Sequence, residues 1–336
     1  MSIRDVLIVG GGPSGLATAI AAKQQGLDYV IVEKGILVNS IFNFPTHMVF
    51  FTTPELLEIG GLPLVTPYDK PTRLEALRYY RRVVDTYGLQ VSFREQVLEI
   101  EREPDGIFTV TTGHVDAGRT FTVRRVRQAR AVVLAIGYCD HPNYLGVPGE
   151  HLPHVSHYYT QSHPYYRQRV VIVGGKNSAA EAALELFRAG AHVTLVHRRA
   201  ALGDSIKYWV KPDIENRIKE GSIKARFETK ILEITPTSVV VESMDGTRDD
   251  IPAEGVFLLT GYHPDVDLMR RAGIHCDEDT LEPELNKDTF ESNVPNLFIA
   301  GGAIAGRRTG NIFIENGRFH GERIITVLAD RLREAG

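Results

Sequence analysis

The chain has 336 residues, of which 43% are hydrophobic and 24% charged, and its formal net charge is −4. This length and composition predict a soluble globular protein of two or three domains. The charge gives no electrostatic reason to expect nucleic acid or an acidic membrane as a partner. Two distant cysteines, Cys139 and Cys276, exclude a C-x-x-C dithiol and a cysteine-rich metal site, and they predict a reducing, cytoplasmic location.

Signals for targeting, membrane insertion and metal binding are absent from the sequence. The stretch DVLIVG at 5–10 already predicts a buried strand, so we expect no signal peptide before it. No apolar run approaches the roughly 20 residues that span a bilayer. Histidines and acidic residues are scattered and lack the spacing of metal ligands.

One pattern occurs twice along the chain. It is DVLIVGGGPSGLATAIAAKQQGLDYVIVEK at 5–34 and RVVIVGGKNSAAEAALELFRAGAHVTLVHRR at 169–199. Each copy has an apolar run, a glycine-containing turn, an alanine-rich helical stretch and a second apolar run, which predicts a βαβ unit in a parallel sheet. Each half later closes on an apolar strand that ends in Gly-Tyr, at 131–138 and 255–262.

The remaining segments define the expected domains. An aromatic insertion follows Glu33 in the first copy. Beyond residue 265 we expect one more buried strand, NLFIAGG, and a final helix from about residue 315. That last segment is too small for a core of its own, so we expect it to return to the first domain. The sequence therefore predicts an α/β protein with two Rossmann-like dinucleotide-binding domains, the second inserted into the first, at 1–142 plus 262–336 and at 143–261.

The first copy completes the G-x-G-x-x-G motif with Gly10, Gly12 and Gly15. The first glycine makes the tight turn, the second lets the backbone approach a pyrophosphate, and the third permits close packing of helix on strand. Glu33 ends the second strand, where a carboxylate can accept hydrogen bonds from ribose hydroxyls. We interpret this copy as a dinucleotide site; the alternative is that the glycines serve packing alone.

The second copy departs from the motif at its middle glycine. Gly174 and Ala179 keep the turn and the close packing, but Lys176 replaces the second glycine. Such a side chain must point away from a pyrophosphate or lie along it and add positive charge. At the position of the acid stands His197, followed by Arg198 and Arg199, and such a change suits a 2′-phosphate. We predict a working NADPH site; the alternative is a dead motif with a solvated basic strand end.

Two dinucleotide domains in one chain suggest a flavin held by the first and a nicotinamide delivered by the second. Hydride would pass from NADPH to FAD and then onward to an acceptor. The chemistry belongs to the cofactors, which the protein positions and tunes.

The residues resemble the low-molecular-weight thioredoxin reductase superfamily over nearly the whole chain, in the paired motifs, the Gly-Tyr strands and HRR at 197–199. That superfamily carries a C-x-x-C between the first closing strand and the second motif, and here the interval 139–168 has no dithiol. The chain is more similar to the bacillithiol-disulfide-reductase-like flavoproteins of YpdA type, in IFNFPTHMVFFTTPELLEIG, GYCDHPNYLGVPGE, VIVGGKNSAAEAALEL, LTGYHPD and IFIENGRFHG. The resemblance implies FAD, NADPH, a homodimer and reduction of a low-molecular-weight disulfide.

From the motifs and the resemblance together we expect two sets of cofactor contacts. Those for FAD are Gly10, Gly12, Pro13, Ser14, Gly15, Glu33, Lys34, Ser40, Asn43, Thr46, Val97, Ala135, Gly137, Gly301, Ile314 and Glu315. Those for NADPH are Gly174, Lys176, Asn177, Ser178, Ala179, His197, Arg198, Arg199 and Gly261.

The thiol chemistry departs from the resembling family. Its bacillithiol-reducing members carry a cysteine in the first motif, as GGGPCG, where this chain has Ser14. A hydroxyl cannot perform thiol–disulfide exchange, because only a thiolate is a competent nucleophile and leaving group. Cys139, after the first closing strand, could instead act through a mixed disulfide as the catalytic thiol; the alternative is an inert small apolar residue. Cys276 has acidic neighbours that raise a thiol pKa, and we expect no role for it.

Other residues could surround the flavin. The start of the last helix, near Ile314–Asn316, would place amide donors at the pyrimidine end of the ring; the alternative is a plain helix start. His47 and His320 could donate protons or be structural. The stretch SHYYTQSHPYY at 156–166 could be an acceptor surface or only a connection. Four aromatic residues either form core or wall the flavin: Phe42, Phe44, Phe50 and Phe51.

Three hypotheses remain for the second half-reaction. The first is reduction of a small disulfide, of bacillithiol or a similar thiol. The second is an NADPH-dependent reductase of ferredoxin or flavodoxin, small electron-carrier proteins, because a related branch also lacks the dithiol. The third is a flavoprotein that senses NADPH through domain rotation and turns over little.

Overall fold

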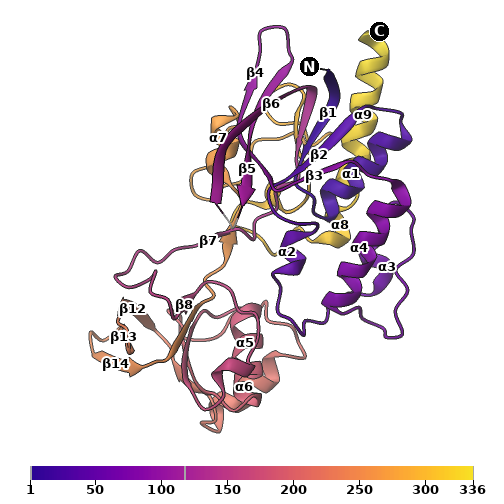
Figure 1. The fold of residues 1–336 in the computed structure, drawn as a ribbon. Helices are drawn as coiled ribbons and strands as arrows, with labels where there is room; N and C mark the ends of the chain where they lie inside the picture. The colour runs from indigo at the N-terminus through magenta and orange to yellow at the C-terminus, as the bar shows by residue number, and fades with distance from the viewer. Residues whose placement is uncertain (1, 117–118, 336) are drawn as a thin grey trace. The chain divides into compact units, whose positions relative to one another are not determined.

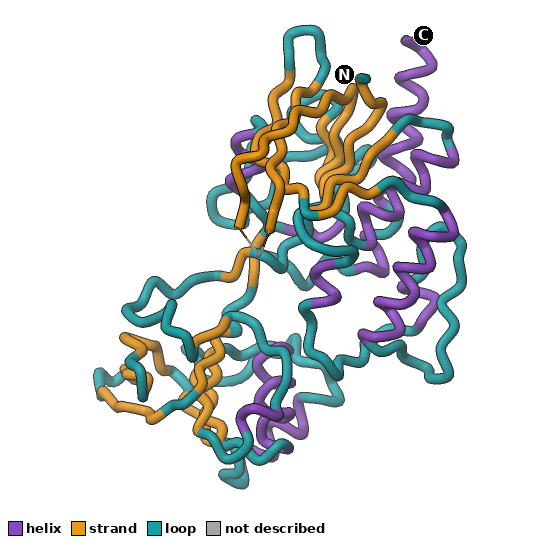
Figure 2. The backbone as a smooth tube through the Cα atoms, in the orientation of Figure 1, coloured by secondary structure: helices purple, strands orange, loops and turns teal. Residues whose placement is uncertain are grey.

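The computed structural model describes residues 2–116 and 119–335, which divide into two compact units (Figure 1). Unit 1 comprises Met1–Asn43, Met48–His141 and Tyr262–Gly336, and unit 2 comprises Phe44–His47 and Pro142–Gly261. Two short strands, β7 (His141–Pro142) and β16 (Tyr262–His263), pair where the chain passes between the units. Figure 2 shows the main strands of unit 1 and those of unit 2 in separate sheets.

Unit 1 is built on a seven-stranded sheet with the order β3-β2-β1-β6-β5-β4, and β17 also pairs with β6. Strands β1, β2, β3, β17 and the second half of β6 are parallel, whereas β4, β5 and the first half of β6 form an antiparallel meander. The bounds are β1 Ile3–Val9, β2 Tyr29–Glu33, β3 Val91–Phe93, β4 Glu95–Arg102, β5 Phe108–Asp116, β6 Arg119–Leu134 and β17 Leu297–Ile299.

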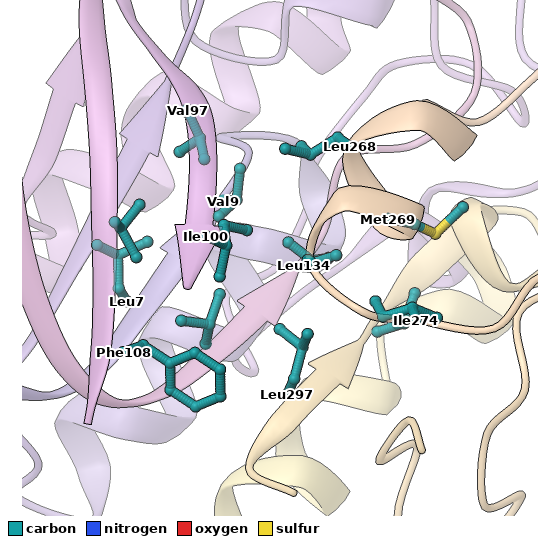
Figure 3. Close-up of a cluster of buried hydrophobic side chains, with 14 of the residues drawn as sticks. Leu7, Val9, Val97, Ile100, Phe108, Leu134, Leu268, Met269, Ile274 and Leu297 are labelled. Carbon is teal, nitrogen blue, oxygen red and sulfur yellow. The ribbon is translucent and has the colours of Figure 1, made fainter. Parts of the chain in front are cut away.

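Helices cover one face of the parallel part of this sheet, and the antiparallel meander lies over its other face. Helices α1 and α9 pack together beside β1 and β2 (Figure 1). On the opposite face, the meander and α7 enclose an apolar core in which Leu7, Phe108, Leu134 and Met269 are fully buried (Figure 3). The helices are α1 Pro13–Gln24, α2 Asn39–Phe42, α3 Pro54–Leu57, α4 Arg73–Tyr87, α7 Val266–Arg271, α8 Ile314–Gly317 and α9 His320–Ala335, with a 3-10 turn η2 at Gly301–Ala305.

Unit 2 has a five-stranded parallel sheet with the order β11-β10-β9-β15-β8 and a three-stranded antiparallel sheet, β12-β13-β14. Its central strands, β9 and β15, are apolar and almost fully buried, as expected for strands covered on both faces. The bounds are β8 Val155–Ser156, β9 Arg169–Val173, β10 His192–Val196, β11 Lys224–Arg226, β12 Thr229–Ile234, β13 Ser238–Ser243, β14 Arg248–Pro252 and β15 Gly255–Leu258, with α5 Asn177–Arg188, α6 Lys211–Lys219 and a 3-10 turn η1 His163–Tyr165.

The final helix differs from the sequence-based expectation. We expected one helix from about residue 315, but α8 ends at Gly317 and α9 begins at His320. Gly317 is buried, and a Cβ there would lie 3.2 Å from the Cα of Gly301, so this glycine serves close packing rather than helix continuity. Glycine also weakens a helix by about 1 kcal/mol relative to alanine. The helical segment thus begins close to the expected residue, but it is divided into two helices.

Membrane insertion has no structural support in the described chain. Over residues 2–116 and 119–335, no helix combines the length and the apolar character that crossing a bilayer requires.

Candidate functional site

The glycines of the first motif connect β1 to α1, and two of them are required by the protein's own packing. Gly10 has φ +111°, and a Cβ there would lie 2.4 Å from the carbonyl oxygen of Ala135. A Cβ on Gly15 would lie 2.0 Å from the carbonyl oxygen of Gly10. Any side chain at these positions would push the helix away from the strand.

Gly12 is different, because nothing in the described protein requires a glycine there. Its φ of −81° is accessible to any residue, and a Cβ would meet no described atom within 4 Å. Gly12 is also the N-cap of α1, and no described side chain caps this helix. The amide donors of the first turn therefore face a space that a side chain at Gly12 would fill, and such a cradle suits a phosphate group.

The carboxylate of Glu33 closes the same loop from the end of β2. Its Oε2 accepts a 2.6 Å hydrogen bond from the N–H of Gly11, and its Oε1 accepts a 2.7 Å bond from the N–H of Gly35. Burial raises the pKa of Glu33, and these two backbone bonds oppose that rise. Each carboxylate oxygen keeps a further lone pair, so the group can also accept bonds from ribose hydroxyls.

Ser14 occupies a narrow slot at the start of α1. A Cβ on Gly301 would lie 2.4 Å from Ser14 Oγ, and a Cβ on Gly317 would lie 3.3 Å from it. Segments far apart in sequence thus meet at this hydroxyl. A side chain at Gly301 would clash with it, and one at Gly317 would be in tight contact with it.

Unit 1 holds most of the residues that the sequence assigns to FAD. Lys34 forms a 2.9 Å ion pair with Asp140, and a Cβ at Gly137 would meet no described atom within 4 Å. Val97 lies in β4 of unit 1, and its side chain is buried in the apolar core. Thr46 is the exception, because it belongs to unit 2, where its N–H donates to Thr160 O. The others in unit 1 are Pro13, Ser40, Asn43, Ala135, Gly301, Ile314 and Glu315.

The residues expected at the pyrimidine end of the flavin form the short helix α8. This helix has only four residues, Ile314–Gly317, and the amide of its N-cap, Phe313, donates to Asn316 Oδ1 at 2.8 Å. A helix this short has a weak macrodipole, and the role of the Ile314–Asn316 amides toward the flavin stays a prediction.

The aromatic insertion divides between core and surface. Phe50 is buried, whereas Phe42 and Phe51 are exposed, and Phe51 meets Phe313 edge to face at 5.6 Å. His47 is exposed in the segment that groups with unit 2.

The Cys139 thiol lies in surroundings that suppress its reactivity. Burial raises the pKa of Cys139 to about 12, and nearby Asp140 adds to the rise, while a hydrogen bond with Ser40 opposes it. A thiol with this pKa is protonated at neutral pH and is a weak nucleophile. This environment favours the interpretation of Cys139 as an inert residue. Burial also raises the pKa of Cys276.

The second motif has the same backbone plan with a lysine in place of the middle glycine. A Cβ on Gly174 would lie 2.7 Å from Leu259 O and 2.8 Å from the Cβ of Ala179, so the turn and the helix packing are kept. Lys176 is the exposed N-cap of α5 in an extended conformation, which any residue adopts. Its Cγ would lie 3.6 Å from a Cβ on Gly203, so the lysine stem runs beside the loop that follows β10.

That loop is fixed to the start of α5 by Asn177. The Asn177 side chain donates to Ser205 O at 3.0 Å and accepts from the N–H of Lys207 at 2.9 Å. The N–H of Gly203 donates to Gly175 O at 2.8 Å. Sequence reasoning missed Gly203, because neither its spacing nor its neighbours show that it lies beside Lys176. Ser178 is exposed next to Asn177, and Gly261 (φ +93°) ends the unit.

A basic cluster ends β10. The pKa of His197 is lowered, mainly by burial and further by the positive charges of Arg199 and Arg198. The ring is therefore neutral at neutral pH. Both arginines are exposed, and neither guanidinium has an acidic partner among the described residues. Two unpaired guanidinium groups beside an uncapped helix N-terminus form an arrangement that suits a phosphate monoester.

The stretch at 156–166 has a structural role in unit 2. Ser156 lies in β8, which pairs with β15, and Tyr159 and Tyr165 each pack edge to face on Phe257, at 5.4 and 5.2 Å. These contacts favour the interpretation of this stretch as a connection.

Comparisons with known proteins agree with this geometry. A family model described as pyridine nucleotide-disulphide oxidoreductase matches residues 7–301. Bacilliredoxin reductase Bdr of Bacillus subtilis (strain 168) is 42% identical over 325 residues, which cover 97% of each chain. The structure of bacillithiol disulfide reductase Bdr (YpdA) from Bacillus cereus superposes with a TM-score of 0.94 at 41% identity, over 98% of this chain and 100% of that one.

A more distant comparison concerns the fold. Thioredoxin reductase of Lactococcus lactis superposes with a TM-score of 0.76 at 20% identity, over 98% of this chain and 99% of that one. The expected fold, with two Rossmann-like sheets of thioredoxin-reductase type and no C-x-x-C, is confirmed.

Proposed function

The chain belongs to the pyridine nucleotide-disulphide oxidoreductase family, and on this premise we propose that it uses NADPH and FAD to reduce a low-molecular-weight disulfide of the bacillithiol-disulfide kind. In this proposal, unit 1 binds FAD at the N-terminus of α1, and unit 2 binds NADPH at the N-terminus of α5. The bound cofactors supply the chemistry, in which a hydride leaves the nicotinamide for the flavin and two electrons go on to the disulfide.

The observation that carries the proposal is the contrast between the two strand ends. In unit 1 a buried carboxylate, Glu33, faces the glycine loop, and it would accept hydrogen bonds from the ribose hydroxyls of FAD. In unit 2 the equivalent position is a neutral histidine followed by the exposed Arg198 and Arg199, which would hold the 2′-phosphate of NADPH.

Gly12 and Lys176 occupy the equivalent motif position in the two units, and each is assigned to a cofactor pyrophosphate. The open space at Gly12 lets the FAD pyrophosphate reach the amides of α1. In unit 2 the Lys176 side chain lies beside Gly203 and adds a positive charge along the NADPH pyrophosphate.

The choice of a small disulfide follows the two relatives of about 41% identity, whose names are bacilliredoxin reductase and bacillithiol disulfide reductase. The proposal includes no mixed disulfide with the protein, because Ser14 carries no thiol and the Cys139 thiol stays protonated.

An anaerobic titration of the FAD-loaded protein tests the cofactor assignment. We expect NADPH to bleach the flavin absorbance at a much lower concentration than NADH, because only NADPH engages both arginines. Bleaching by neither nucleotide would support the NADPH-sensing alternative. Turnover with bacillithiol disulfide and with ferredoxin or flavodoxin then identifies the acceptor, and activity with the carrier protein alone would contradict a disulfide substrate.

The homodimer stays a prediction, and so does the cytoplasmic location. Sedimentation of the FAD-loaded protein measures the first, and cell fractionation measures the second.

A further inference from the structure

His320, the first residue of α9, makes a buried contact that links three segments of unit 1. Its side chain is only 7% exposed, and its ring stacks on Phe290, with centroids 4.2 Å apart and an interplanar angle of 22°. Its Nδ1 lies 3.1 Å from the backbone N–H of Gly301 and accepts its hydrogen bond. An accepting Nδ1 carries no proton, so the proton of this neutral ring is on Nε2.

Gly301 is the residue that His320 holds in place. It follows β17 with φ +72°, a conformation that favours glycine. It packs closely against Ser14 and Gly317, and a side chain at Gly301 would clash with Ser14. Because Ser14 is in the first turn of α1, the Gly301 backbone forms part of the wall beside the proposed FAD phosphate cradle.

The neighbour of His320 makes a second contact with the same helix. A Cβ on Gly321 would lie 2.4 Å from Thr18 Oγ1, and Thr18 Oγ1 donates to Ser14 O at 2.7 Å. The start of α9 therefore touches α1 directly and touches the Gly301 turn through the His320 ring.

We propose that His320 is a positioning residue of the flavin site, whose unprotonated Nδ1 fixes the Gly301 turn against Ser14 and so sets the wall on which the cofactor rests. The inference rests on the proposed function in taking FAD as the ligand of unit 1. Burial, and the nearby Arg323, lower the pKa of His320 to about 4, which keeps Nδ1 unprotonated at neutral pH.

Two matched variants separate the hydrogen bond from the packing. His320→Asn places a carbonyl oxygen close to the position of Nδ1 and loses the ring, whereas His320→Phe keeps a ring on Phe290 and loses the acceptor. We expect the Phe variant to bind FAD about tenfold more weakly, with shifted flavin absorbance and midpoint potential, and the Asn variant to keep all three near wild type. Equal losses in both variants would reduce His320 to a packing residue and overturn the inference.

A third variant and a measurement without cofactor complete the test. Phe290→Leu removes the stacking partner alone, and we expect a lower Tm with unchanged FAD affinity; a tenfold loss of affinity here would overturn the inference. In FAD-free wild type, histidine ¹⁵N NMR should show the Nε2–H tautomer for His320, and the Nδ1–H tautomer would also overturn it. A wild type that binds no FAD would instead overturn the proposed function.

Discussion

The imidazole of His197 lies so close to Gly175 that a Cβ on this glycine would be 2.2 Å from His197 Cε1. The equivalent pair in unit 1 is Gly11 and Glu33, which share a 2.6 Å hydrogen bond. One backbone plan therefore carries a carboxylate in the first unit and a neutral ring in the second. The acid that would repel a 2′-phosphate is absent where the phosphate is expected.

Replacing the ring by an acid should reverse the nucleotide preference. In His197→Glu, the new carboxylate can accept from Gly175 N–H and from a ribose 2′-hydroxyl, and it repels a 2′-phosphate. We expect NADPH to bind about 10–100-fold more weakly and NADH to bind as well or better, measured by flavin bleaching. His192→Glu, at the exposed opposite end of β10, is the control. An unchanged ratio of the two nucleotides would contradict the assignment of this strand end.

The three basic residues assigned to the NADPH site should differ in their effect on NADPH and NADH binding. Replacing Arg198 and Arg199 by alanine should weaken NADPH far more than NADH, because only NADPH has a 2′-phosphate. Lys176→Gln should weaken both about fivefold, the value of one exposed ion pair with the shared pyrophosphate. Arg188→Ala, at the far end of α5, serves as the control. Equal losses of both nucleotides in the double arginine variant would refute the 2′-phosphate role.

The fold was predictable where the sequence repeats itself. The two copies of the motif correctly predicted β1–α1–β2 and β9–α5–β10, because continuous apolar runs and glycine turns are local signals. The grouping of Phe44–His47 with unit 2 was not predictable, since it depends on a hydrogen bond from Thr46 to Thr160, far away in sequence. The break between α8 and α9 likewise depends on the distant partners of Gly317.

In the site, too, the local features were predictable from the sequence and the contacts between distant residues were not. The separate roles of Gly10, Gly12 and Gly15 follow from the motif, and the structure gives the steric reason for the first and the third. The contact of Lys176 with Gly203 and the bond from Gly301 to His320 join residues that no spacing connects. Such pairs become visible only when the chain is folded.

Disulfide turnover should survive the loss of the Cys139 thiol. Because the pKa of Cys139 is raised to about 12, Cys139→Ser removes no thiolate at neutral pH. We expect unchanged kcat/KM for the disulfide, measured by NADPH consumption. Ser14→Cys is the informative partner variant, because it places a thiol in the slot between Gly301 and Gly317. Loss of turnover in Cys139→Ser, with FAD still bound, would show that Cys139 is the redox thiol after all.

Stability should fall in acid because of His320. Its pKa is lowered to about 4 in the folded protein, whereas an unfolded histidine has a pKa near 6.5. The unfolded chain therefore takes up this proton first, and stability is lost as the pH falls from 6.5 to 4, by about 3 kcal/mol at most. Urea unfolding at fixed FAD concentration measures this slope.

His320→Asn should remove that part of the pH dependence, because asparagine does not titrate, and its unfolding free energy should change less between pH 6.5 and 4 than that of wild type. His192→Asn, at an exposed histidine, is the control for the removal of a histidine. If His320→Asn and wild type lose stability in parallel over this range, the ring of His320 is not the group that resists protonation in the folded state.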